Sequence, residues 1–232
     1  MTSKTLKWIA IIMMTIDHIG LYLVTPEDIT LLIILRGLGR LAFPFFAFFV
    51  SEGFKHTREL KKYFFRLLGY AILIQIALTV FYFASGVNYM IVGNVFWPLV
   101  FGLLASILIK ERKTAFTILG FSLIIIADLI GFPYGGYGVA FILIFTFVEP
   151  FYKKVLYAFI VHLAYIAYPI AFLIPEFVTR YNLPVESIQW LAMLSLIPIY
   201  FYNGKLGKMN KYFFYIYYPV HLAVIFGISL LI

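Results

Sequence analysis

Hydrophobic residues occur along the chain in long uninterrupted runs, separated by short polar segments that carry most of the charges. Runs of this length, without the alternation of strands, indicate helices that cross a membrane. We therefore expect an all-α integral membrane protein, a polytopic bundle of about nine transmembrane helices. The predicted spans are residues 8–24, 38–54, 64–83, 93–109, 115–131, 137–149, 155–174, 187–202 and 213–232.

The composition supports this interpretation. Of the 232 residues, 64% are hydrophobic and 12% are charged, whereas soluble domains are about 45–50% apolar. This excludes a soluble globular domain or a disordered chain, and residues 1–232 are predicted to form a single transmembrane domain. The chain has no cysteine, which excludes a thiol nucleophile and a cysteine-ligated metal. We expect no metal cofactor.

The positions of the charges predict the orientation. Most of the 18 lysines and arginines fall in loops on one side of a nine-span bundle, which the positive-inside rule assigns to the cytoplasm together with the N-terminus. The C-terminus is then outside. A formal net charge of +8 therefore indicates contact with membrane lipids, and no nucleic-acid partner is expected. The opposite loops hold Glu27, Asp28, Glu176 and Glu186, with Arg180 as a cation.

Ionisable side chains inside a predicted span are costly in a membrane, so each one indicates a functional site or a structural ion pair. The candidates are Asp17, His18, Arg36, Arg40, Glu52, Asp128, His162 and His221.

The first span holds the most informative pair. Lys7 and His18 are eleven residues apart, which places them on one helical face about 16 Å from each other. One interpretation is a buried imidazole that acts as a base above a cation that binds an anionic donor. The alternative is a helix end at Lys7 and a structural bond from His18 to a neighbouring span. Asp17 points about 100° away from His18, so no contact between them is assumed.

Two arginines follow in the segment 36–40. Arg36 and Arg40 share a helical face, and they can pair with Asp17 or with an anionic substrate, or anchor the span at the interface. The glycines between them allow another backbone to come close. Pro44 lies in the same span and is expected to kink it.

Basic and aromatic residues near two other spans suggest further sites. Glu52 closes the second span, and Arg58, Lys62 and Arg66 follow at helical spacing, which is typical of a surface for acidic lipid or for phosphates. Before the last span, Lys205 and Lys208 form a basic turn suited to phosphate. Tyr217 and Tyr218 then share a face with His221, as an interface belt or as part of a site.

Beyond these patterns, the chain resembles the TraX-type proteins over nearly its whole length. The most specific strings are the opening and closing ones, and the middle of the chain is mostly apolar. The similar segments are 6–10, 17–20, 36–44, 48–54, 57–58, Tyr63, Arg66, 93–96, 137–139, 202–204, 211–215 and 218–222.

The resemblance implies a membrane acetyltransferase in the bacterial inner membrane. The family's namesake acetylates the N-terminus of a conjugative pilin subunit, and the family looks related to the type-3 membrane acyltransferases. Those enzymes carry a basic residue ahead of a histidine in the first span, which corresponds here to Lys7 and His18. Their usual basic residue is arginine, so Lys7 keeps the charge but not the bidentate geometry.

The implied reaction moves an acetyl group from cytoplasmic acetyl-CoA to an amine or hydroxyl acceptor, such as a pilin-like N-terminus or a cell-envelope glycan or lipid. A transporter or flippase that uses buried His, Arg and Asp is the alternative, and a non-catalytic assembly factor is a third interpretation. The expected catalytic residues are His18 as base, Asp17, Arg36, Arg40 and His221. Acetyl-CoA is expected to bind Lys7, Arg58, Lys62, Arg66, Lys205 and Lys208, and the acceptor Glu52, Asn94, Tyr217 and Tyr218.

Overall fold

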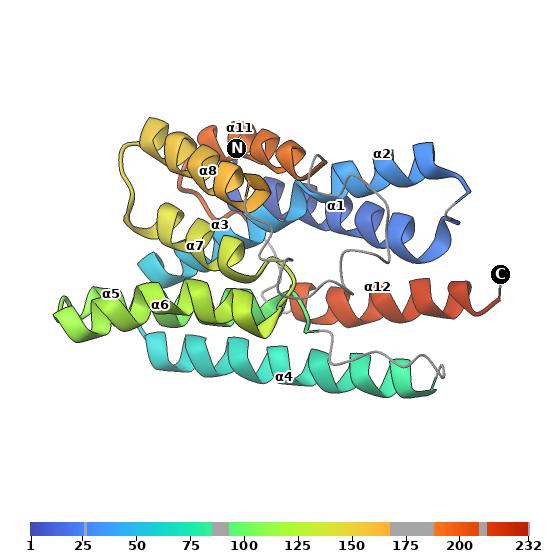
Figure 1. Ribbon diagram of the computed structural model, residues 1–232, viewed down its shortest axis with the longest axis horizontal. Coiled ribbons are helices and arrows are strands. Elements are labelled where there is room, and N and C mark those ends of the chain that lie inside the picture. The colour runs from blue at the N-terminus through green and yellow to red at the C-terminus, as the bar shows by residue number, and fades with distance from the viewer. Residues whose placement is uncertain (26, 85–92, 168–187, 209–212, 232) are drawn as a thin grey trace. The chain divides into compact units, whose positions relative to one another are not determined.

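The computed structural model of the protein describes residues 1–25, 27–84, 93–167, 188–208 and 213–231 (Figure 1). Within these ranges the regular structure is helical and contains no strand. The helices are α1 (Ser3–Leu23), α2 (Ile29–Gly39), α3 (Ala42–His56), α4 (Leu60–Ala84), α5 (Phe96–Lys110), α6 (Thr114–Ile130), α7 (Gly135–Phe147), α8 (Phe151–Ala167), the 3₁₀-helix η2 (Trp190–Ser195), α11 (Leu196–Tyr200) and α12 (Phe213–Ser229).

Several helices are suited to a membrane, as the hydrophobic runs predicted. Three segments of the described chain are long and apolar enough to cross one, namely Ser3–Leu23, Ile29–His56 and Leu60–Phe83. Other apolar helices are shorter, among them α5, α6 and α7. The all-helical fold with apolar helices suited to a membrane is confirmed for the described residues, whereas the nine spans and the cytoplasmic N-terminus stay predictions. The predicted loop charges Glu176, Arg180 and Glu186 lie outside the described residues.

The second predicted span differs from the helices of the structure. A single span was expected at residues 38–54, but α2 begins earlier and the helix is interrupted at Arg40 and Leu41. Pro44 explains the position of the break, because proline has no N–H to donate to the carbonyl one turn earlier, at Arg40. The expected kink therefore becomes a break that separates α2 from α3.

The described chain divides into two compact units, whose boundaries fall inside α3 and α8. The first unit contains Met1–Phe46 and His162–Ile232, and the second contains Ala47–Val161. The prediction of one domain over residues 1–232 stays a prediction.

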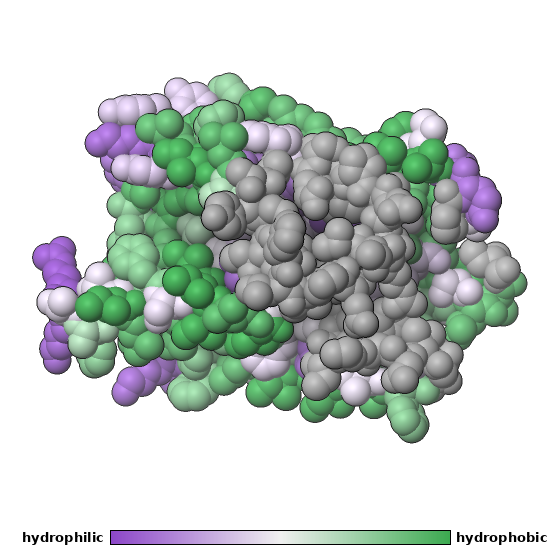
Figure 2. Space-filling view, in the orientation of Figure 1, coloured by the Kyte–Doolittle hydropathy of each residue, from purple (hydrophilic) through white to green (hydrophobic). Residues whose placement is uncertain are grey.

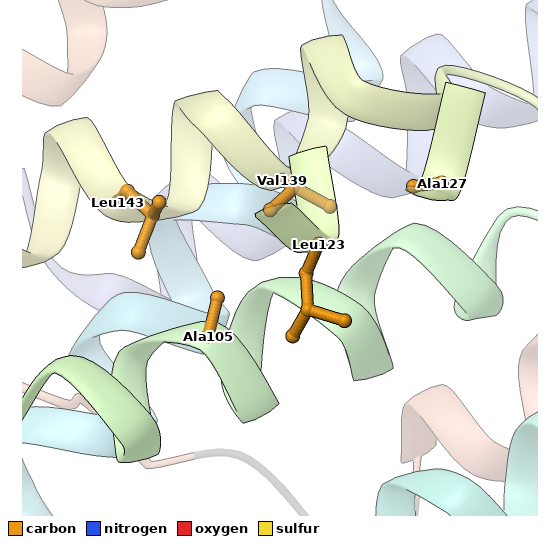
Figure 3. Packing of buried hydrophobic residues seen from close by; sticks show 5 residues of the cluster. All are labelled: Ala105, Leu123, Ala127, Val139 and Leu143. Atoms are coloured by element: carbon orange, nitrogen blue, oxygen red, sulfur yellow. The ribbon is translucent and has the colours of Figure 1, made fainter. Parts of the chain in front are cut away.

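The second unit is held together by close packing of α5 against α4, α6 and α7. Small and branched side chains fill its core, and Gly102 allows a close approach, because a Cβ there would lie 2.3 Å from Cδ1 of Ile142. The carboxylate of Asp128 on α6 accepts a hydrogen bond from the N–H of Gly136 in the first turn of α7. Asp128 thus joins α6 to α7. The core cluster in Figure 3 comprises Ala105, Leu123, Ala127, Val139 and Leu143.

Large apolar side chains also cover the outside of the helices. On α4, Val80 and Phe83 are 62% and 88% exposed, and on α6, Ile125 and Leu129 are each 61% exposed. Figure 2 shows wide hydrophobic areas on the described helices and small hydrophilic patches. A monomeric soluble protein rarely exposes so much contiguous apolar surface, whereas lipid is a suitable neighbour for these residues.

The first unit is built around α1, which packs against α2 and α12. The polar turn at 203–208 closes the start of α1, where the backbone N–H groups of a helix have no partner inside the helix. The N–H of Ser3 donates to the carbonyl of Lys205 at 2.8 Å, and the N–H of Lys4 donates to that of Leu206 at 3.0 Å. These bonds attach the segment before α12 to the first turn of α1.

Candidate functional site

Helix α1 presents two different polar faces to its two neighbours. Thr15, His18 and Tyr22 follow one another at spacings of three and four residues, so they share a face. That face contacts α12, whereas Asp17 contacts α2. The predicted divergence of Asp17 from His18 is consistent with these separate partners.

On the first face, two histidines form a direct hydrogen bond. Nδ1 of His18 lies 2.8 Å from Nε2 of His221, and the ring centroids are 5.0 Å apart. The Nδ1–H of His221 in turn donates to the backbone carbonyl of Tyr217 at 3.0 Å. His221 is 7% exposed, whereas His18 is only partly buried. The structure thus brings together two residues that the sequence singled out separately.

Aromatic rings hold this histidine pair on several sides. The ring of Tyr217 lies nearly parallel to that of His221, with centroids 5.1 Å apart and planes at 12°. Tyr218 meets His221 edge-on at 5.3 Å, and Tyr22 packs beside His18 at 6.1 Å. These contacts restrict the rotation of both imidazoles.

Thr15 completes the contact with α12, although the sequence analysis did not identify it. Its hydroxyl donates to the carbonyl of Ile11 at 2.9 Å, so its oxygen accepts from the hydroxyl of Tyr217, 2.7 Å away. Thr15 lies three residues before His18, on the same helical face. This spacing was the one signal in the sequence that could have identified Thr15. It is weak, because an uncharged threonine in a helix does not by itself indicate a site.

On the second face, Asp17 bonds two arginines. Arg36 lies in the last turn of α2, and Arg40 directly follows the end of that helix. Oδ2 of Asp17 lies 2.7 Å from Nη1 of Arg36, and Oδ1 lies 3.3 Å from Nη2 of Arg40. Nε of Arg40 also donates to the carbonyl of Arg36 at 3.2 Å. Gly39 faces the carboxylate, since a Cβ there would be 2.1 Å from Oδ1 of Asp17. The predicted pairing of both arginines with Asp17 is therefore present.

A groove of about 390 Å³ runs between α1 and α12, and of the two bonded histidines His221 lines it. Thr15, Tyr217 and His221 provide its polar groups, and most of the remaining lining is aliphatic, for example Ile19 and Val224. A polar group in this groove would lie near the imidazole of His221, which is bonded to His18, while an apolar portion lies along the helices. Among the described residues, no group of three His, Cys, Asp or Glu side chains is arranged to hold a metal ion.

The basic residues expected to bind the donor fall into two sets. Lys7, Lys205 and Lys208 belong to the same unit as His18. Lys7 is a half-buried residue of α1, and the turn that carries Lys205 is bonded to the first turn of α1. The structure thus joins these two basic segments, which are distant in sequence.

The other set lies in the second unit, at the start of α4. There Nζ of Lys62 pairs with Glu59 at 2.6 Å, and the guanidinium of Arg66 lies 5.5 Å from the ring centroid of Tyr63. Arg58 directly precedes this pair in sequence. A donor surface shared by both sets stays a prediction.

Two residues expected to bind the acceptor also belong to the second unit. Glu52 lies 3.4 Å from Nε2 of His56 and 4.0 Å from Nζ of Lys55 within α3. Contact between Glu52 and an acceptor stays a prediction.

Asn94 joins α4 to α5. This buried amide donates to the carbonyl of Ala71 at 2.9 Å and to Oε1 of Gln75 at 3.1 Å, and its oxygen accepts from the N–H of Phe96 at 3.0 Å. Gln75, which the sequence analysis missed, also accepts from Nε1 of Trp97. The bonds describe a structural role, and acceptor binding by Asn94 stays a prediction.

His162 is fully buried in the first unit. Its Nε2–H donates to the carbonyl of Gln189 at 3.2 Å, and its ring stacks on Trp190 at 5.5 Å between centroids. These contacts attach α8 to the segment that begins η2. An alanine at position 162 would therefore disturb folding.

Comparison with known proteins relates the chain to one family. The family described as TraX protein matches residues 2–229. The probable fimbrial assembly protein FimC, serogroup H1, of Dichelobacter nodosus is 30% identical over 233 residues, which cover 95% of this chain and 92% of that protein. The uncharacterized protein RP591 of Rickettsia prowazekii (strain Madrid E) is 42% identical over 77 residues, 33% of this chain and 27% of that protein. No solved structure matches the chain.

Proposed function

Because the chain belongs to the TraX family, we propose that it is a membrane acetyltransferase that uses cytoplasmic acetyl-CoA and acts in a bacterial inner membrane. The observation that carries this proposal is the bond between His18 and His221, since the imidazole of His221 lines the groove of α1 and α12. An oriented imidazole next to an accessible groove has the geometry that a general base needs.

The proposed reaction is a direct transfer. The nitrogen or oxygen of the acceptor attacks the thioester carbonyl, and the new C–N or C–O bond forms as the C–S bond breaks. His18 takes the proton from the acceptor and returns it to the departing sulfur, so the products are the acetylated acceptor and CoA with a free thiol. A covalent cysteine intermediate is excluded, because the chain has no cysteine.

The developing oxyanion requires positive charge or hydrogen-bond donors in the site. Arg36 and Arg40 are proposed to supply that charge, and Asp17, which bonds both guanidiniums, is proposed to orient them. Asp17 directly precedes His18 on α1, and Asp17, Arg36 and Arg40 all belong to the same unit as this base.

The phosphates of acetyl-CoA are proposed to bind the lysines at the start of α1. The backbone bonds between the 203–208 turn and the first turn of α1 support this, because they attach Lys205 and Lys208 to the helix that carries Lys7 and His18. The second unit carries three further basic residues that are proposed to attract the negatively charged donor through their charge, namely Arg58, Lys62 and Arg66.

The acceptor is proposed to be a protein of a surface appendage. The similar protein of Dichelobacter nodosus is named a fimbrial assembly protein, and a pilin-like N-terminal amine would provide the nucleophile. A hydroxyl of a cell-envelope glycan or lipid is the second class of acceptor. Tyr217 and Tyr218, beside the histidine pair, are proposed to contact it.

The test is acetyl transfer by purified protein in detergent, with radiolabelled acetyl-CoA and peptide or glycan acceptors. We expect His18→Ala to lower kcat by about 10²- to 10⁴-fold, the usual contribution of a general base. Equilibrium binding of acetyl-CoA should be unchanged, because the base does not hold the donor.

His56→Ala is the matched control, since the His56 side chain is 69% exposed and belongs to the second unit, whereas His18 and His221 belong to the first. It should retain wild-type activity. A folded His18→Ala protein that transfers acetyl groups within a few-fold of wild type would contradict the proposal. Substrate movement into vesicles without consumption of acetyl-CoA would instead favour a transporter or flippase, an alternative supported by the ion pairs of Asp17 within apolar helices.

A further inference from the structure

We infer that His221 sets the tautomer of His18, so that the lone pair of His18 lies on Nε2. The catalytic meaning of this inference rests on the proposed function, but its geometric basis does not. His221 is then a positioning residue, which acts through His18.

The first step concerns the proton of His221. The carbonyl of Tyr217 can only accept a hydrogen bond, so the Nδ1 atom of His221, 3.0 Å away, must carry the hydrogen. A neutral imidazole has one N–H and one lone pair. Nε2 of neutral His221 is therefore an acceptor.

The second step follows along the chain of bonds. Nε2 of His221 and Nδ1 of His18 lie 2.8 Å apart, and one of them must donate. Since Nε2 of His221 accepts, Nδ1 of His18 carries the hydrogen. The lone pair of neutral His18 is consequently on Nε2, the nitrogen that a general base would use toward the acceptor.

The contacts of Tyr217 explain why the two imidazoles keep these protonation sites. Tyr217 both stacks on His221 and supplies the carbonyl that orients it, and the hydroxyl of Tyr217 is held by Thr15 on α1. A flip of the His221 ring would break the bonds to Tyr217 and His18 together. The bond that one ring nitrogen makes decides which form the other nitrogen takes. In serine proteases, loss of the correct histidine tautomer lowers kcat by about 10⁴-fold.

The direct test is the nitrogen NMR spectrum of the full chain in detergent, with ¹⁵N in its four histidines. His18→Gln and His56→Gln variants assign the signals. At neutral pH we expect a protonated, pyrrole-type Nδ1 and an unprotonated, pyridine-type Nε2 for His18. A protonated Nε2 on His18 would overturn the inference.

Two substitutions of His221 sharpen the test. His221→Gln can place an amide oxygen near the position of Nε2, where it accepts from Nδ1–H of His18, whereas His221→Phe keeps a ring but removes the acceptor. For histidines that bind a metal, loss of such an orienting partner typically lowers metal affinity or activity 10- to 100-fold. We therefore expect kcat to fall by about that factor in the Phe variant, with the KM for acetyl-CoA unchanged, and to recover most of the loss in the Gln variant.

The Phe variant should also show His18 signals that have moved toward the Nε2–H form. Equal loss of kcat in folded Gln and Phe variants, or no loss in either, would overturn the inference. If the Phe variant does not fold, the wild-type and Gln spectra decide. An inactive wild-type protein with the expected tautomer would contradict the proposed function and support this inference, and an active one with Nε2–H on His18 would do the reverse.

Discussion

The two faces of α1 differ in how their polar groups are used. Toward α2, Asp17 makes ionic contacts with Arg36 and Arg40, which lie 19 and 23 residues away in sequence. Toward α12, His18 bonds to His221, 203 residues away, through groups that need no charge. The ionic face joins two consecutive helices through residues close in sequence. The histidine face joins α1 to α12 through a hydrogen bond in which one imidazole donates and the other accepts. We expect the first to dominate stability and the second to dominate activity.

The largest expected effect on stability comes from removing the shared carboxylate. Asp17→Asn leaves two guanidiniums that are only 16% and 8% exposed without their counter-ion. Breaking a buried ion pair costs about 3–5 kcal/mol, which a shift of thermal unfolding in detergent would measure.

Glu59→Gln is the control, because its ion pair with Lys62 is 61% and 78% exposed. Exposed pairs contribute about 0–1 kcal/mol, so its unfolding should hardly change. Equal effects of the two substitutions would break the comparison, since the Asp17 contacts would then be no more than surface pairs.

A smaller loss is expected from closing the space beside the carboxylate. Gly39→Ala would place a Cβ 2.1 Å from Oδ1 and 2.3 Å from Cβ of Asp17, so α1 and α2 would have to separate. Overpacking of this kind costs about 1–3 kcal/mol, measured by the same unfolding assay.

Gly227→Ala on α12 is its control, because a Cβ there meets no atom within 4 Å. Alanine should stabilise that helix by about 0.5–1 kcal/mol relative to glycine. An unfolding temperature for Gly39→Ala at or above that of wild type would show that the close contact of α1 with α2 is not needed.

The smallest effect is expected on the other face. Tyr217→Phe removes one hydroxyl bond to Thr15, while Thr15 keeps its own bond to Ile11. One such bond contributes about 0.5–1.5 kcal/mol. Tyr152→Phe, at a position 66% exposed, should change stability by less than about 0.5 kcal/mol. If Tyr217→Phe lowered the stability as much as Asp17→Asn, the two faces would not differ in their contribution to stability.

The sequence could predict the members of the ionic face, and their pairing with Asp17 was one of three alternatives. Asp17, Arg36 and Arg40 are expensive in apolar helices, and the spacing of the arginines puts them on one side. Consecutive helices commonly pack together, which favours the pairing of Asp17 on α1 with the two arginines at the end of α2. The start of α2 was missed, because hydrophobicity alone does not show where a helix begins, and Pro44 predicted a kink where the helix is in fact interrupted at Arg40 and Leu41.

The histidine face could be predicted only in part. The cost of burial identified His18 and His221, and the spacing placed Tyr217 beside His221. No local pattern could pair residues 203 positions apart, and Thr15 carries no charge that would mark it. For the second unit, sequence reasoning assigned Asn94 to the acceptor, but its bonds to Ala71 and Gln75 depend on the packing of α4 against α5.

The contacts between α1 and α12 also constrain how often the chain passes through the bilayer. Thr15 meets Tyr217, His18 meets His221, and Tyr22 packs on Phe226 at 4.5 Å, so residue numbers increase together along the two helices. The two helices therefore run parallel. Two parallel helices that both cross a bilayer must be separated by an odd number of intervening crossings. A chain with α1 as its first and α12 as its last crossing then has an odd total, a parity that a count of nine satisfies and eight or ten does not.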